Sequence, residues 1–362
     1  MIELNNFIAE YIEIKQEIDS AVSSVLNSGQ YILGDNVKNF EREFSKYIGV
    51  KYCVGVASGT DAITLSLLAN GIGTGDEVIT SNFTAYPTVA GIINSGSTPI
   101  LVDVSLNDAL IDVNLIEAAI TQKTKAIIPV HLYGHPCNMD AIKKISEKYK
   151  LILIEDCAQA LGAEYNGNKI GSIGSCGAFS FYPTKNIGAY GDAGAVVTNN
   201  KSVYNQLISL RNYGNVEGYL HQEKGLNSRL DEIQAAILAV KLKFIEEWNR
   251  RRISIGNYYS NNIRNHDLFS LDPNVKHVYH IFAIRSKKRE KFMSHLKTLN
   301  IETKVHYPAT IHQNDFLHSS NMSNYYKSTL LANEVMSIPL NPWLSENEIL
   351  TIVGTINEFE NV

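Results

Sequence analysis

Short apolar runs rich in β-branched residues recur between residues 52 and 198, and most of them are followed by a segment with helical periodicity. This alternation is typical of an α/β domain built on a sheet whose strands run mostly parallel. The expected helices span 60–70, 85–95, 113–121 and 139–149. The seven expected strands span 52–56, 77–80, 99–104, 126–132, 151–156, 177–181 and 194–198.

The last two expected strands constrain the sheet further. Only the segment YPTKNIGAYGDA separates them, which is too short for a parallel crossover with its helix. We therefore predict a mostly parallel seven-stranded sheet with one antiparallel edge strand. From Ser228 the pattern changes to one long helix, SRLDEIQAAILAVKLKFIEEWNRRRISIGNYY, followed by single strands such as VYHIFAIR and ETKVHYP between helices.

Length and composition bound the domain count and the partners. A chain of 362 residues exceeds the ~250 to 300 at which one hydrophobic core stops growing. We expect a large domain over 1–245 and a smaller α+β domain over 246–362. The charged fraction of 19% argues against disorder, and a net charge of −5 without a long basic run argues against nucleic acid and membrane surfaces as partners.

The cysteines and the N-terminus indicate the compartment. Four cysteines occur without a Cys-x-x-Cys pair, so we expect them to be reduced and the protein to be cytoplasmic. The N-terminal segment is acidic and amphipathic, unlike a secretory signal, and no apolar run approaches the ~18 residues of a membrane span.

Two strand ends carry polar residues that suit a bound ligand. Ser58, Gly59 and Thr60 lie between a strand and a helix N-terminus, where free N–H groups and the helix dipole favour a phosphate. Taken alone, however, such a segment is more often an ordinary strand-to-helix turn with Ser or Thr as the N-cap. The strand LILIED ends in Glu155 and Asp156, whose carboxylates need compensation when buried. Mg²⁺ is disfavoured because no G-x-x-x-x-G-K-[ST] motif occurs, which also argues against a kinase or ATPase. Two explanations for the carboxylate remain: it binds a protonated pyridine nitrogen, or it is a structural cap at the end of the strand.

Lys185 lies in a tight turn flanked by aromatic residues and followed by glycines, in FSFYPTKNIGAYGDAGAVV. A lysine in a partly desolvated pocket loses its proton more readily and becomes a Schiff-base nucleophile, whereas a solvated turn lysine has no such role.

The cluster His131, His135 and Cys137 superficially suggests a zinc site. Because this stretch ends a strand and meets Pro136, we expect no metal.

Taken together, these segments resemble the DegT-type nucleotide-sugar aminotransferases, pyridoxal-phosphate enzymes with the aspartate-aminotransferase fold of type I. This resemblance implies a three-layer large domain and a homodimer with shared active sites. The motifs that carry the resemblance run over nearly the whole chain. They are SGQYILGDNVKNFEREFSKYIGVKYCVGVASGTDA, GIGTGDEVIT, TKAIIPVHLYGHPCNMDAI, IEDCAQALGA, FSFYPTKNIGAYGDAGAVVT, RNYG, GLNSRLDEIQAAIL, HVYHIFAIR, VHYPATIH and IPLNPWL.

The resemblance also implies roles for single residues. Lys185 matches the lysine that binds the cofactor covalently and then shuttles the substrate proton, and Asp156 matches the partner of the pyridine nitrogen. The family pattern has an aromatic residue two positions before Pro87 to stack on the ring, but Ala85 stands there, so we assign stacking to Tyr86. The other expected cofactor contacts are Ser58, Gly59, Thr60, Gln159, Ser180 and, from the neighbouring subunit, Asn227. The expected substrate contacts are Tyr182, Arg229, His306, Tyr307 and His312.

The implied activity is a ping-pong transamination that moves nitrogen from an amino acid, expected to be L-glutamate, to a keto-sugar. Lysine at position 185 favours transamination over removal of a sugar hydroxyl, because the relatives that remove a hydroxyl carry histidine there. The NSRLDEIQAAIL and HLYG segments resemble the branch that aminates nucleotide-linked 3-keto-6-deoxyhexoses, in deoxyamino-sugar biosynthesis for polysaccharides. Three alternatives stay open: a 4-keto nucleotide sugar, a small phosphorylated ketone, and a non-catalytic ligand-binding or regulatory relative.

Overall fold

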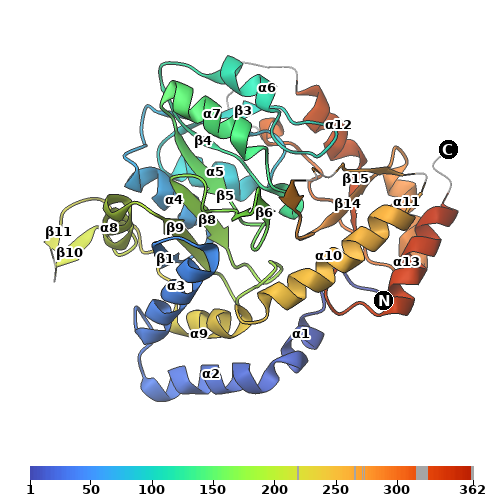
Figure 1. The fold of residues 1–362 in the computed structure, drawn as a ribbon, viewed down its shortest axis with the longest axis horizontal. Helices are drawn as coiled ribbons and strands as arrows, with labels where there is room; N and C mark the ends of the chain where they lie inside the picture. Colours follow the sequence, from blue (N-terminus) through green and yellow to red (C-terminus); the bar gives the residue numbers. More distant parts are fainter. Residues whose placement is uncertain (218–219, 265, 271, 273, 315–324, 360–362) are drawn as a thin grey trace.

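The computed structural model describes residues 1–362 except 218–219, 265, 271, 273, 315–324 and 360–362 (Figure 1). The α-helices are α1 (Phe7–Glu13), α2 (Lys15–Ser28), α3 (Asp35–Ile48), α4 (Gly59–Ala69), α5 (Tyr86–Asn94), α6 (Val113–Ile116), α7 (Met139–Tyr149), α8 (Lys201–Leu210), α9 (Glu232–Lys241), α10 (Ile245–Asn262), α11 (Arg289–Thr298), α12 (Tyr326–Glu334) and α13 (Glu346–Glu358). The strands are β1 (Tyr52–Val56), β2 (Glu77–Ser81), β3 (Thr98–Val102), β4 (Thr124–Ile128), β5 (Ile152–Asp156), β6 (Glu164–Tyr165), β7 (Asn168–Lys169), β8 (Cys176–Ser180), β9 (Gly194–Thr198), β10 (Asn215–Glu217), β11 (Leu220–His221), β12 (Asp267–Leu268), β13 (Val275–Lys276), β14 (Phe282–Arg285) and β15 (Val335–Ile338).

The seven expected strands form one sheet in the order β1-β9-β8-β5-β4-β2-β3. Strand β9 pairs antiparallel with β1 and with β8, and the remaining pairs are parallel, which confirms the mixed, mostly parallel sheet. The antiparallel strand therefore lies next to the edge, and β1 forms the edge itself. Because β9 runs opposite to its neighbours, the short segment after β8 suffices to connect the two strands.

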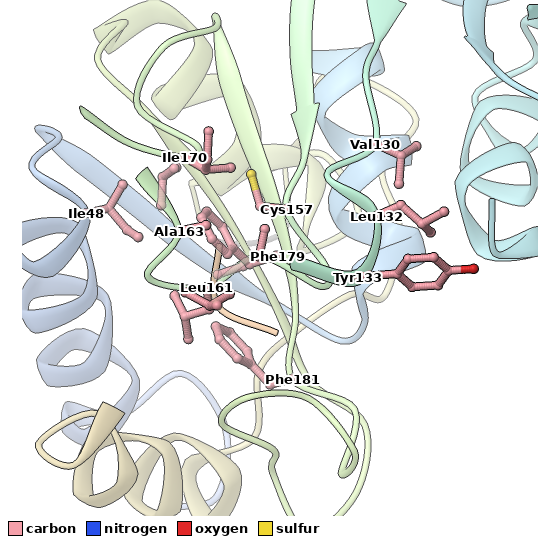
Figure 2. Packing of buried hydrophobic residues seen from close by; sticks show 14 of the residues in the cluster. Ile48, Val130, Leu132, Tyr133, Cys157, Leu161, Ala163, Ile170, Phe179 and Phe181 are labelled. Atoms are coloured by element: carbon pink, nitrogen blue, oxygen red, sulfur yellow. The ribbon is translucent and has the colours of Figure 1, made fainter. Parts of the chain in front are cut away.

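Helices cover both faces of this sheet and produce the three expected layers (Figure 1). Side chains alternate along each strand, so that Val54, Ile128 and Val196 pack in the cluster with α4 and α8. Ile127 of β4 and Phe179 of β8 belong instead to the cluster that contains α3, α7 and α9. Figure 2 shows Phe179 and Phe181 in that second cluster. Burial on both faces explains why these strands are apolar throughout.

The prediction of a single long helix from Ser228 is wrong. The chain forms α9 and α10, separated by a turn over Leu242–Phe244. Helix α9 packs against α2 and α3, whereas α10 contacts α13, so the chain must change direction between them. The break contains neither proline nor glycine, and its periodicity continues the helical pattern, so the sequence carries no signal for it.

The C-terminal part contains a three-stranded sheet in the order β12-β14-β15, with α11 and α13 beside it (Figure 1). The strand expected at ETKVHYP is reduced to one bridge between Lys304 and Ser337. The N-terminus joins this part, because Ile2 bridges Ile301. The boundary expected at 245/246 coincides with the start of α10 and stays a prediction. No helix within the described ranges is long and apolar enough to cross a membrane.

Candidate active site

The candidate site lies where strands of the large sheet end. Ser58 follows β1, Asp156 ends β5 and Ser180 ends β8, and these three strands run in the same direction. The carboxyl ends of strands that run in one direction meet at one edge of a sheet, which is where α/β proteins bind ligands. The topology therefore gathers residues that are far apart in the sequence.

The expected phosphate residues meet at the N-terminus of α4. Ser58 is the N-cap, and its hydroxyl accepts a hydrogen bond from Asp61 N at 3.1 Å. An ideal Cβ built on Gly59 would lie 2.6 Å from the Ser180 Cβ, so the absence of a side chain allows α4 to approach the end of β8. Thr60 lies in the same first turn. The structure thus brings Ser58, Gly59, Thr60 and Ser180 together around the positive end of a helix dipole.

Asp156 is a buried carboxylate with two identified donors. Thr88 Oγ1 donates to its Oδ2 at 2.8 Å, and Ala158 N donates to its Oδ1 at 3.1 Å. Burial raises the pKa of Asp156, and these two hydrogen bonds, together with the charge of Lys185, act in the opposite direction. Each carboxylate oxygen keeps a lone pair for a further donor, such as a protonated ring nitrogen.

Thr88 is a residue that the sequence analysis missed. It lies in the first turn of α5, is 2% exposed, and its hydroxyl also contacts Thr84 Oγ1 at 3.0 Å. Since an ionised Asp156 can only accept, Thr88 donates to it and Thr84 donates to Thr88. Thr88 and Asp156 are 68 residues apart in the sequence, so no local pattern marks the contact between them.

Lys185 lies in the turn after β8, where its backbone N–H donates to Tyr182 O at 2.8 Å. Burial lowers the pKa of Lys185 to about 8, and attraction by Asp156 acts against this shift. The charge of each side chain acts on the pKa of the other, and Gln159, which follows Asp156 closely in the sequence, lines the same cavity as Lys185. Helix α9 anchors the same turn, because Lys241 Nζ donates a hydrogen bond to Gly188 O at 2.6 Å.

A cavity of about 110 Å³ opens beside Lys185. The lining residues come from the N-terminal segment, the end of β5, the Lys185 turn and the C-terminal part of the chain. They are Leu4, Asn5, Gln159, Thr184, Lys185, His280, Ile281, Lys304, His306, Tyr307, Ile338 and Leu340. Three expected site residues besides Lys185, namely Gln159, His306 and Tyr307, therefore share one cavity with it.

Hydrogen bonds fix the orientation of these cavity residues. Gln159 Oε1 accepts from Tyr133 N at 2.7 Å, and its Nε2 donates to the Tyr307 hydroxyl at 2.9 Å. The Tyr133 hydroxyl, which Figure 2 shows pointing away from the apolar cluster, donates to His306 O. Burial lowers the pKa of His306 to about 4, and burial raises that of Tyr307 to about 12. Both side chains are therefore neutral near pH 7.

Two expected contacts are exposed aromatic side chains. Tyr86 begins α5 and is 45% exposed, whereas Phe83 is buried and its ring lies 6.5 Å from that of Tyr307. Tyr182 is 53% exposed. An exposed ring can stack on a ligand, so the assignment of ring stacking to Tyr86 stays a prediction.

Three other expected residues lie outside the cavity. Asn227 is exposed, and its side chain makes no hydrogen bond with the part of the chain that the structure describes. Arg229 donates to Asn212 Oδ1 at 3.0 Å. His312 Nδ1 lies 2.9 Å from Asn82 Nδ2, in the link between the C-terminal segment and the end of β2. Within this chain, Arg229 and His312 make contacts that stabilise the fold, and their binding of substrate stays a prediction.

One buried group resembles a metal site in composition. The potential ligand atoms of His131, Glu155 and Cys157 lie within 4.8 Å of one another. However, the Glu155 carboxylate accepts backbone N–H bonds from Gly171 at 2.9 Å and Gly174 at 2.7 Å, and Ile173 donates a third bond. These donors supply the compensation that the burial of Glu155 requires.

The described residues fit pyridoxal phosphate. The α4 N-terminus offers N–H and hydroxyl donors for a phosphate, Asp156 offers a buried acceptor for a ring nitrogen, and Lys185 offers an amine of lowered pKa. The Gly59 position has no room for a side chain, as a close-packed phosphate cradle requires. The arrangement suits chemistry in which an amine and a carbanion-stabilising ring must be held together.

Comparisons with known proteins agree with this geometry. The model of the DegT/DnrJ/EryC1/StrS aminotransferase family matches residues 12–357. A dTDP-3-amino-3,6-dideoxy-alpha-D-galactopyranose transaminase of Aneurinibacillus thermoaerophilus is 45% identical over 347 residues, which cover 95% of this chain and 96% of that protein.

Two solved structures are similar over nearly the whole chain. The structure of S. venezuelae DesV in complex with ketimine intermediate has a TM-score of 0.96 at 38% identity, with 99% of this chain and 98% of that chain covered. The structure of ntda from Bacillus subtilis with bound cofactor PMP has a TM-score of 0.89 at 30% identity, covering 95% of this chain and 81% of that one. The chain therefore belongs to the DegT/DnrJ/EryC1/StrS aminotransferase family, and its cofactor is pyridoxal phosphate.

Proposed function

We propose that this aminotransferase moves an amino group from L-glutamate to a nucleotide-linked 3-keto-6-deoxyhexose. The observation that carries this choice is the 45% identity, over almost the full length of both chains, with a transaminase named for a 3-amino-3,6-dideoxy sugar on dTDP. The cavity beside Lys185 supports a polar acceptor, because Gln159, His306 and Tyr307 present polar groups to it. A 4-keto nucleotide sugar and a small phosphorylated ketone are the competing acceptors.

Each residue of the site has a separate role in the proposed reaction. When bound, pyridoxal phosphate supplies an aldehyde that takes up the amino nitrogen and a ring that accepts electrons from the deprotonated substrate carbon. Asp156 holds a proton on the ring nitrogen through a charge-assisted hydrogen bond. Lys185, whose pKa of about 8 leaves part of its amine neutral near pH 7, takes the proton from the substrate carbon at Nζ. Ser58, Thr60 and the α4 N-terminus hold the phosphate in place.

We further propose that the enzyme is a cytoplasmic homodimer in which Asn227 reaches the phosphate of the partner's site. The exposed Asn227 side chain supports this, as do Tyr213 and Leu220, which are 47% and 68% exposed on the arm that carries β10 and β11 (Figure 1). Four buried free cysteines, Cys53, Cys137, Cys157 and Cys176, support a reducing compartment.

The experiment that tests the function offers the purified holoenzyme L-glutamate with a dTDP-linked 3-keto-6-deoxyhexose or its 4-keto isomer, and identifies the aminated product by mass. We expect the 3-amino sugar to form at least tenfold faster than the 4-amino sugar. Lys185→Ala should abolish turnover, and borohydride should fix the cofactor on Lys185 of the wild-type protein. Preference for the 4-keto sugar would contradict the acceptor, and turnover by Lys185→Ala would contradict the mechanism.

A further inference from the structure

His280 is a buried histidine to which the sequence motifs assign no role. It lies between β13 and β14, its side chain is 8% exposed, and it lines the same cavity as Lys185 and His306. Its position raises the question of which ring nitrogen carries a proton, because this decides whether the ring donates or accepts toward a ligand.

A chain of hydrogen bonds answers that question. The Leu161 carbonyl can only accept, so the amide nitrogen of Asn249 faces it, at 2.9 Å. The Asn249 oxygen then accepts from the amide nitrogen of Asn186 at 2.8 Å. The remaining Asn186 oxygen lies 3.0 Å from His280 Nδ1 and, being an acceptor, requires a proton on that nitrogen. A neutral His280 ring therefore carries its lone pair on Nε2.

The surroundings keep the His280 ring neutral. Burial holds its pKa well below the usual range, and the positive charges of Lys185 and Arg252 and a protonated His306 would act in the same direction. A neutral ring with a proton on Nδ1 has one remaining function, which is to accept a hydrogen bond at Nε2. His280 is thus an acceptor in the cavity and not a carrier of protons.

His280 Nε2 lacks a protein donor. Among the residues that the structure describes, none hydrogen-bonds this nitrogen. His131 Nε2 and His266 Nδ1 are fully buried polar atoms without a hydrogen-bond partner, but His280 Nε2 is not fully buried. It therefore keeps accessible surface where His280 lines the cavity. A buried acceptor without a donor loses hydration unless a ligand or water supplies the missing hydrogen bond.

We propose that His280 Nε2 accepts a hydrogen bond from a hydroxyl group of the keto-sugar, which makes His280 a specificity-determining residue for the sugar. The polar groups of Lys185, Lys304 and Tyr307, which line the same cavity, present N–H and O–H donors. His280 supplies the acceptor that a ring hydroxyl needs. The carboxylates of an amino-acid donor have no hydrogen to give, and its amino group is the nitrogen that is transferred to the cofactor, so we assign the contact to the sugar half of the reaction. This inference rests on the proposed function.

The variant His280→Asn tests the contact, because the asparagine amide can still donate to Asn186 but has no group at the Nε2 position. We expect the KM for the dTDP-linked 3-keto-6-deoxyhexose to rise about three- to tenfold, while the rate of amino loading from L-glutamate stays unchanged. An unchanged sugar KM, or equal loss in both half-reactions, would overturn the proposal. Failure of the wild-type enzyme to aminate any keto-sugar would instead overturn the proposed function.

A second measurement needs no variant. In wild-type holoenzyme labelled with ¹⁵N-histidine, His280 should show a protonated Nδ1. His131 and His277 are matched controls, because their Nδ1 atoms accept from Cys137 N at 3.0 Å and Tyr279 N at 2.8 Å and so predict the opposite tautomer. Saturating dTDP-linked 6-deoxyhexose should shift the Nε2 resonance of His280. A protonated Nε2, or no shift with this sugar, would overturn the proposal.

Discussion

At the scale of single residues, the buried carboxylate of Asp156 shows how the fold prepares the site. Its position at the end of an apolar strand raises its pKa, which would favour the neutral form and weaken its hold on a cationic ring. The Thr88 hydroxyl opposes this shift through a bond of 2.8 Å. We therefore propose that Thr88 is a positioning residue, which opposes the effect of burial on the pKa of Asp156 and orients its carboxylate.

Thr88→Val removes this donor while preserving the shape of the side chain. We expect the pKa of Asp156 to rise and the cofactor to bind about ten- to a hundredfold more weakly, because a hydrogen bond to a charged group contributes about 1.5–3 kcal/mol. Equilibrium titration of the apoprotein with pyridoxal phosphate, followed by absorbance, measures this. Thr88→Ser keeps the hydroxyl and should bind as the wild type does. Equal affinity of the Val and Ser variants would contradict the role of Thr88.

Sequence reasoning reached some residues of the site and not others, for a physical reason. Gln159, Lys185, His306 and Tyr307 were expected, and the structure gathers them around one cavity. His280, like Thr88, was missed, because its significance arises from hydrogen bonds between segments far apart in the sequence. Chemical type and spacing predict what a side chain can do, whereas its partners depend on tertiary packing.

At the scale of secondary-structure elements, the contact between α4 and β8 sets the position of the phosphate cradle. Gly59→Ala would place a methyl group 2.6 Å from the Ser180 Cβ and 3.2 Å from its Cα. We expect a loss of about 1–3 kcal/mol in unfolding free energy and weaker cofactor binding, because α4 must move away from β8. Denaturant unfolding of the apoprotein and cofactor titration measure the two effects.

The matched control for this substitution is Gly354→Ala. Gly354 lies within α13, and an added Cβ there meets no atom within 4 Å. Because alanine favours a helix interior over glycine, this variant should be unchanged or up to about 1 kcal/mol more stable. Equal behaviour of the two alanine variants would show that close packing at Gly59 does not shape the site.

The prediction of secondary structure succeeded where the local sequence pattern and the tertiary packing favour the same element. All seven strands of the sheet and helix α7 were expected from apolar runs and periodicity. The break between α9 and α10 was missed because the direction change serves packing on α2 and α3 and leaves no local mark. The segment 302–308 has strand-like residues but forms only one bridge, between Lys304 and Ser337 on the open edge of β15.

At the scale of the whole molecule, the proposed dimer makes each site depend on two chains. Lys185→Ala subunits, which are inactive alone, and Asn227→Ala subunits, which are weakly active alone, should complement one another when mixed. One of the two sites in a mixed dimer then has both wild-type residues. Random reassociation predicts recovery of about a quarter of wild-type activity. Co-unfolding and refolding of the two variants, followed by an activity assay, measures this. Activity equal to the sum of the separate variants would contradict a shared site.

The central claim is that Lys185 and Asp156 face each other in one site. In the apoprotein, acetic anhydride labelling followed by mass analysis measures the pH at which the Lys185 amine becomes reactive, and we expect a midpoint near its pKa of about 8. Because Asp156 raises this pKa, Asp156→Asn should move the midpoint to lower pH, whereas Asp192→Asn, an exposed position near the same turn, should not. A midpoint for Lys185 that is identical in the wild type and Asp156→Asn would contradict the account.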